Sequence, residues 1–178
     1  MQVSYTAKQL EIQPLLAAAN INPESFLATD YLNHFNEIVM LLEMIPDMPE
    51  LMEDAADWAP KSYPQHFNDS GFQAKDLAIE AYALAPSSFR DEFENLCGKI
   101  NASIQATLQG LKAVNIVERG VSPAAQALIR QRIEDMQNLL LQLNQVIHGK
   151  YEEQRTETYS EPSSEEVQSQ EDIDKLFD

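Results

Sequence analysis

Few side chains in this sequence have the types and spacing that catalysis requires. Asp91 and Asn95 form one pair of an acid and an amide four residues apart, and Glu134 and Asn138 form another. Residues four apart on a helix share a face, so each pair would present its carboxylate and its amide together. Pairs of this kind are also common on the solvated face of any helix. The two pairs are therefore weak catalytic candidates, and an ordinary surface role is the simpler interpretation.

The motifs of conventional enzymes and metal sites are absent from the sequence. It contains no glycine-rich phosphate loop, no G-x-S-x-G, no HExxH and no Cys/His spacing typical of metal ligands. Its three histidines, His34, His66 and His148, leave few candidates for the base of a catalytic triad. Glu37 follows His34 instead of preceding it, and the Glu-x-x-His motif of di-iron bundles is not repeated. We expect no cofactor and no metal site, and we expect His34 to be a hydrogen-bonded or surface residue.

The last ten residues, SQEDIDKLFD, have the chemistry of recognition instead of catalysis. Ile173, Leu176 and Phe177 are spaced i, i+3 and i+4, so on a helix they line one face. Ser169 and Asp172 have the spacing of a capping box at the start of that helix. A helix of this length is marginal alone in water, so it must fold onto its own domain or onto a partner. Residues 150–168 before it are polar and acidic without an apolar period, which predicts a disordered linker.

The same stretch resembles a known peptide of bacterial motility proteins. Ser169, Gln170, Ile173, Asp174 and Leu176 match the pattern S-Q-x-x-I-D-x-L at the N-terminus of the flagellar switch protein FliM. In that family the peptide docks on the phosphorylated response regulator CheY. The CheY phosphatase CheZ ends in a related peptide, after a helical bundle and a flexible linker. The resemblance covers about ten residues of the chain, and the rest resembles no family that we recognise.

The resemblance implies that residues 169–178, including Phe177, form a docking peptide for a CheY-like receiver domain. The preferred interpretation is a non-enzymatic adaptor of chemotaxis or motility signalling. An alternative is a CheZ-like phosphatase, in which an acid and an amide one turn apart position water for attack on an aspartyl-phosphate. The pairs Asp91/Asn95 and Glu134/Asn138 are the nearest equivalents, and neither is the Asp-x-x-x-Gln of that family. A third interpretation is an unrelated partner, or an autoinhibitory helix that docks on its own body.

Composition limits the partners and the compartment. The chain has 178 residues and a net charge of −17, and its isoelectric point is about 4.4. Residues 151–178 hold ten acids and two bases, which gives the tail −8 and leaves −9 for the body. No basic stripe is present, so we expect neither nucleic acid nor an anionic membrane surface as a partner. The single cysteine, Cys97, excludes an internal disulfide and is expected to be a small packed residue in a reducing, cytoplasmic setting.

The pattern of apolar residues predicts an all-α fold. A helical bundle domain over residues 1–149 would precede the linker and the docking peptide. Helices are predicted at 13–20, 23–45, 73–85 and 87–118, from 123 to the glycine at 149, and briefly within 46–60. The last of the long helices carries a heptad seam. The members of that seam are Ile129, Ile133, Met136, Leu140, Leu143 and Ile147.

The short link at residues 120–122 makes the last two long helices antiparallel neighbours in a helical hairpin. Two ways of covering its apolar surface remain open. The helix over 23–45 would cover it within one chain, or a second copy would pair with residues 87–148 to make a homodimer.

The segment at residues 60–72 is predicted to be irregular, because Pro60 and Pro64 interrupt the helical pattern there. It is rich in rings, with Tyr63, His66, Phe67 and Phe72. We expect these rings to pack back on the helices, and the alternative is that they line a small-molecule pocket.

Overall fold

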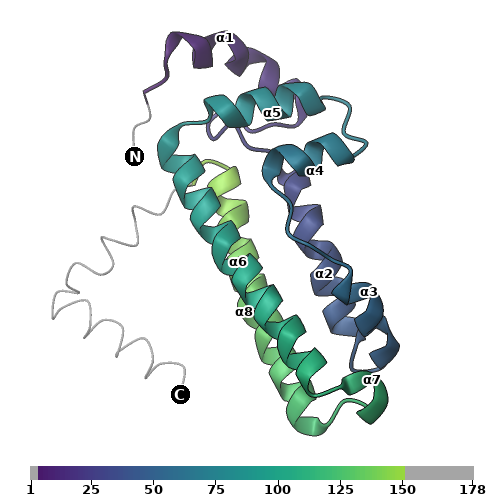
Figure 1. The fold of residues 1–178 in the computed structure, drawn as a ribbon. Coiled ribbons are helices and arrows are strands. Elements are labelled where there is room, and N and C mark those ends of the chain that lie inside the picture. The colour runs from purple at the N-terminus through teal and green to yellow at the C-terminus, as the bar shows by residue number, and fades with distance from the viewer. Residues whose placement is uncertain (1–3, 151–178) are drawn as a thin grey trace, which may run out of the picture. The chain divides into compact units, whose positions relative to one another are not determined.

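The computed structural model describes residues 4–150, and these residues form an all-α unit without strands (Figure 1). The predicted fold class is therefore confirmed. The linker at 150–168, apart from its first residue, and the docking peptide at 169–178 lie outside the described residues. The helices are α1 Ala7–Leu16, α2 Leu32–Met44, α3 Met52–Ala56, α4 Tyr63–Asp69, α5 Lys75–Leu84, α6 Ser87–Ala113, α7 Ile116–Arg119 and α8 Pro123–Ile147. Short 3-10 turns lie at η1 Ala17–Ala19, η2 Thr29–Tyr31 and η3 Pro49–Leu51.

The centre of the unit is the predicted hairpin of α6 and α8, which lie side by side along their length (Figure 1). The Ser122 hydroxyl caps α8 by accepting from the Ala125 amide at 3.1 Å, and Pro123 occupies the first turn, as expected. Four members of the heptad seam are buried, whereas Ile133 and Leu140 are only half-buried. The seam is therefore mostly buried, and only Ile133 and Leu140 are partly exposed.

Helix α2 covers part of the hairpin within the same chain, by packing against α8. Its inward face carries Phe35, Ile38 and Leu42, none of which has any exposed surface. Burying an apolar face in this way is the main source of helical stability in proteins. Helix α2 thus covers the hairpin within one chain, which is one of the two predicted alternatives. The homodimer through residues 87–148 stays a prediction. Within residues 4–150, no helix combines the length and the apolar character needed to cross a bilayer.

The N-terminal predictions were wrong in their boundaries. The first helix spans Ala7–Leu16 instead of 13–20, because a capping box between Thr6 and Gln9 starts it earlier. The next predicted helix begins at Leu32, not at residue 23. Between them, the Asn22 side chain accepts from the Glu24 and Ser25 amides at 2.8 and 3.0 Å, and this turn competes with a helix.

The predicted helix over 87–118 is broken near its end. Helix α6 stops at Ala113, and Asn115 takes a left-handed conformation with φ of 55° before α7 begins. Asparagine adopts this conformation more readily than most residues, which explains why it ends the helix here. Val114, which follows α6, is half exposed at 51%, whereas Ile116 at the start of α7 is buried.

The segment at 60–72 was predicted to be irregular, and this was wrong. It contains α4, which the Ser62 hydroxyl caps by accepting from the Gln65 amide at 3.2 Å. The proline at position 64 falls in the first turn, where its missing N–H costs nothing. The expectation that the rings pack inward is confirmed for Tyr63 and Phe67, which are buried, whereas Phe72 is half-buried and lines a hollow beside η1.

A pair of leucines on α8 tests whether the hairpin seam stabilises the unit. Leu143 is fully buried, whereas Leu141 is 59% exposed. We expect Leu143→Ala to lower the free energy of unfolding by about 2–5 kcal/mol, because it leaves a cavity in the seam. Leu141→Ala should change it by no more than about 0.5 kcal/mol. Urea unfolding of both variants makes the comparison, and equal effects would show that the seam does not dominate the core.

Candidate functional site

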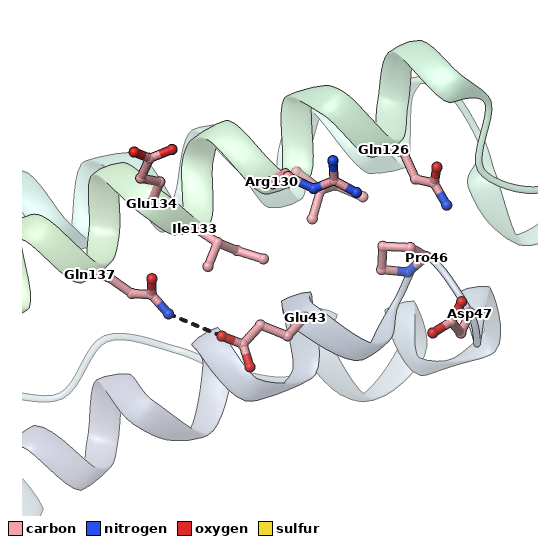
Figure 2. A pocket seen from close by; sticks show the side chains of 9 residues that line it. Glu43, Pro46, Asp47, Gln126, Arg130, Ile133, Glu134 and Gln137 are labelled. Carbon is pink, nitrogen blue, oxygen red and sulfur yellow. Dashed lines mark hydrogen bonds between the residues drawn. The ribbon is translucent and has the colours of Figure 1, made fainter. Parts of the chain in front are cut away.

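An open cleft lies between the C-terminal end of α2 and the first half of α8 (Figure 2). Its volume is about 510 Å³. Both helices contribute, since α2 and α8 pack against each other and run in opposite directions (Figure 1). The residues that line it are Glu43, Pro46, Asp47, Gln126, Ile129, Arg130, Ile133, Glu134 and Gln137.

One hydrogen bond closes the cleft on the side toward the end of α8. The Gln137 amide donates to the Glu43 carboxylate at 3.1 Å across the two helices, as Figure 2 shows. At the other side, Pro46 follows the end of α2 and lies across the cleft from Gln126 and Arg130 (Figure 2). Ile133, which is half-buried, and Ile129, which is buried, form an apolar floor.

The rim of the cleft is acidic. Glu43, Asp47 and Glu134 contribute three carboxylates, and Arg130 contributes one guanidinium. In the part of the chain that the structure describes, Arg130 takes part in no ion pair. The cleft therefore has a formal charge of −2 and one cation that remains available to an incoming carboxylate.

Exposed apolar side chains continue the cleft along the same two helices. Met40 lies three residues before Glu43 on α2, and Leu141 lies four residues after Gln137 on α8, so both follow one turn beyond the bridging hydrogen bond. Because the helices are antiparallel, these two side chains lie at about the same level. Met40 is 58% exposed and Leu141 59% exposed. We call the cleft and this extension the α2–α8 groove; it runs from Gln126 to Leu141 on α8 and from Met40 on α2 to Asp47 in the turn that follows α2.

The groove has the composition of a binding surface. It offers an apolar floor, exposed methionine and leucine side chains and a charged rim, but no imidazole, thiol or hydroxyl among the residues that line the cleft. The sequence patterns did not predict it. A signal was present, because Met40 and Leu141 are large apolar residues that fall off the buried stripes of their helices.

The two predicted acid–amide pairs are not brought together. Asp91 and Asn95 are exposed near the start of α6, whereas Glu134 and Asn138 are exposed near the middle of α8. The start of α6 lies beside the end of α8, so the pairs are at different levels of the hairpin (Figure 1). Glu134 lines the cleft, but Asn138 is not among the lining residues. The side chains of one pair therefore do not combine with those of the other pair into one site.

The rings of α2 and α4 form a packed cluster instead of a pocket. The His34 ring stacks on Trp58 with centroids 4.7 Å apart, and its Nε2 accepts from the Lys61 amide at 3.1 Å. His66 Nε2 lies 2.9 Å from a carboxylate oxygen of Asp30. These contacts confirm that His34 is a hydrogen-bonded histidine. Among residues 4–150, no three His, Cys, Asp or Glu side chains gather closely enough to hold a metal ion.

The tyrosines of this cluster also have hydrogen-bond partners. The Tyr63 hydroxyl accepts from the Ala28 amide at 2.8 Å, and the Tyr31 hydroxyl donates to the Lys61 carbonyl at 2.5 Å. Burial raises the pKa of both hydroxyls well above the ordinary value for tyrosine. They stay neutral and hold the buried turn at Ala28 and the chain at Lys61 in place.

Cys97 is buried between the helices, as expected of a small packed residue. Burial, with a smaller effect of the nearby Glu94 carboxylate, raises the pKa of its thiol well above the ordinary value. A thiol of this kind is a poor nucleophile, because the reactive form is the thiolate.

The residues predicted to bind a partner lie outside the described part of the chain. These are Ser169, Gln170, Ile173, Asp174, Leu176 and Phe177. The comparisons with known proteins do not bear on them either. No family model, no curated protein and no solved structure matches this chain.

The buried His34 predicts a specific dependence of stability on pH. Burial, helped by His66 and Lys61, lowers the pKa of His34 to about 4, from an ordinary value near 6.5. The unfolded chain therefore binds a proton at a pH where the folded chain does not. The resulting stabilisation is complete above pH 6.5 and falls by about 2–3 kcal/mol as the pH is lowered to 4.5. Protonation of Nε2 would also break the hydrogen bond from the Lys61 amide, because two N–H donors would then face each other.

The measurement is urea unfolding of the parent and of His34→Gln at pH 7.5 and pH 4.5. The difference in unfolding free energy between the two proteins should shrink at the lower pH. His148→Gln is the matched control, because it removes an exposed imidazole. If both variants respond to pH in the same way, His34 is not the group responsible.

Proposed function

We propose that this chain is a non-enzymatic adaptor of bacterial chemotaxis or motility signalling, acting in the cytoplasm. Residues 169–178 would dock a CheY-like receiver domain. One observation carries the proposal: Ser169, Gln170, Ile173, Asp174 and Leu176 match S-Q-x-x-I-D-x-L. The apolar residues of this pattern share one helix face, which is how an amphipathic peptide fills a groove on its partner.

The chemistry of the body supports a role in binding over a role in catalysis. The side chains with the most reactive potential, His34 and Cys97, are occupied in packing and hydrogen bonding. The predicted acid–amide pairs are separate and exposed. The body also ends at the described residue Lys150, so a tether of about twenty residues would separate the peptide from α8.

Phosphatase activity on the receiver is the second candidate function. It is favoured by the position of Glu134, which lines the cleft only one turn from Gln137. The Gln137 amide, however, already donates to Glu43. The rate of receiver dephosphorylation, with and without the full chain, separates the two functions. An adaptor leaves this rate unchanged, whereas a phosphatase raises it and loses the effect in Glu134→Ala.

Substitutions on the predicted peptide face test the adaptor proposal. Ile173→Asp and Phe177→Asp should each weaken binding of the full chain to a CheY receiver at least tenfold, because one buried apolar side chain contributes about 1.5–3 kcal/mol. The titration is done with and without beryllium fluoride as the phosphoryl mimic, and we expect tighter binding in its presence. The melting temperature of the body should not change.

Val167→Asp is the matched control, since it replaces an apolar residue that precedes the pattern. It should retain the affinity of the parent. Equal affinity for the parent, Ile173→Asp and Phe177→Asp would remove the basis of the proposal. A fall in melting temperature in the two peptide variants would instead assign the segment to the chain's own core.

A further inference from the structure

We propose that the α2–α8 groove is a second docking surface, which binds a basic amphipathic helix of a partner protein. This inference goes beyond the adaptor function, since it concerns the body of the chain and not residues 169–178. It rests on the shape of the groove, on its exposed apolar residues and on the sign of its charge.

The cleft and the exposed strip beyond the Gln137–Glu43 hydrogen bond together have the length of a bound helix. From Gln126 to Leu141 on α8, fifteen helical steps of about 1.5 Å give a length of about 22 Å. This length matches a helix of about four turns. The cleft at one end has a volume of about 510 Å³, enough to receive a large side chain from such a helix.

The apolar contacts would come from both helices. Met40 on α2 and Leu141 on α8 are exposed at about the same level, and Ile133 lies half-buried in the cleft. These positions lie about two turns apart along α8, so they would contact residues near i and i+7 of the bound helix. Methionine adapts well to different apolar partners because its side chain is unbranched and polarisable.

The charge of the rim decides which kind of helix fits. Glu43, Asp47 and Glu134 surround the cleft, and the body as a whole carries −9. Lysine and arginine residues flanking the apolar face of a partner would complement these carboxylates. A second copy of this acidic chain would be repelled. Arg130, which has no ionic partner among residues 4–150, is suited to a single carboxylate within the basic helix.

The probe is a fifteen-residue amphipathic peptide with leucine on one face and lysine on the other. The matched probe has glutamate at every lysine position. Both are titrated into the isotope-labelled full chain at 0.15 M salt and followed by amide chemical shifts. We expect the lysine peptide to bind at least tenfold more tightly, with shifts concentrated on α2 and on residues 126–141 of α8. Shifts confined to residues 151–178, or spread over all acidic surfaces, would overturn the proposal.

Variants of exposed groove residues give the decisive comparison. The double variant Met40→Ser with Leu141→Ser should bind the lysine peptide at least tenfold more weakly. Leu10→Ser is the control, because Leu10 is 54% exposed on α1 and lies outside the groove. If the double variant fails to fold, Glu134→Lys provides the same test through charge. Unchanged affinity in these variants would overturn the proposal.

Two further measurements separate this proposal from a dimer and from the adaptor proposal. Sedimentation of the chain without peptide would show a dimer, lost in the double variant, if the groove bound a second copy instead of a basic helix. Binding of a CheY receiver through residues 169–178 should be the same in the double variant and the parent. These measurements therefore test the groove and the proposed docking peptide independently.

Discussion

The packing of α6 against α8 is the contact on which the rest of this structure depends. These are the two longest helices, and their facing side chains, such as Ile104, Met136 and Leu143, are almost wholly removed from water. The hairpin then provides the surface on which the shorter elements are ordered. Helix α2 packs on α8, and the buried turn before it is fixed to the end of α8, where the Ser25 hydroxyl donates to the Ile147 carbonyl at 2.5 Å. Most helical stability comes from tertiary packing of this kind, and α3, α4 and α5 are too short to persist alone.

A few polar groups are buried beside the apolar core, and a few large apolar side chains remain exposed. The ring cluster of α2 and α4 holds His34, Tyr31 and Tyr63, and the polar atoms described above all have hydrogen-bond partners. Such a network fixes the structure, because an unpaired buried polar group is costly. It also engages Nε2 of His34 and the hydroxyls of Tyr31 and Tyr63 in hydrogen bonds. The outer edge of α2 and α8, in contrast, exposes Met40 and Leu141 beside a charged cleft. Exposed apolar residues that lie next to one another mark surfaces for partners more often than isolated ones do.

The two surfaces that we propose for binding have different physical characters. Residues 169–178 carry four acids, one lysine and the apolar residues Ile173, Leu176 and Phe177. The α2–α8 groove contains an open cleft between two packed helices, and three carboxylates lie on the rim of that cleft. In these proposals residues 169–178 would insert into one partner and the groove would receive another, so the chain would bring two proteins together. Linking two binding events through one chain raises the effective concentration of each partner near the other, to an extent set by the length of the tether.

The sequence alone determined the fold class, the hairpin and the α8 cap, because these follow from local spacing: apolar residues at three and four, and Ser-Pro after a glycine. It also predicts a docking peptide at residues 169–178, from a pattern that is local as well. The helix boundaries at Leu32 and Ala113 escaped prediction because they depend on competing turns at Asn22 and Asn115. The start of α4 at Tyr63 escaped prediction because this short segment is helical only when its rings pack on the other helices. The groove was decided by tertiary structure alone. Met40 and Glu43 are about a hundred residues away from Leu141 and Gln137 in the chain, and only the packing of α2 on α8 places their side chains along one surface.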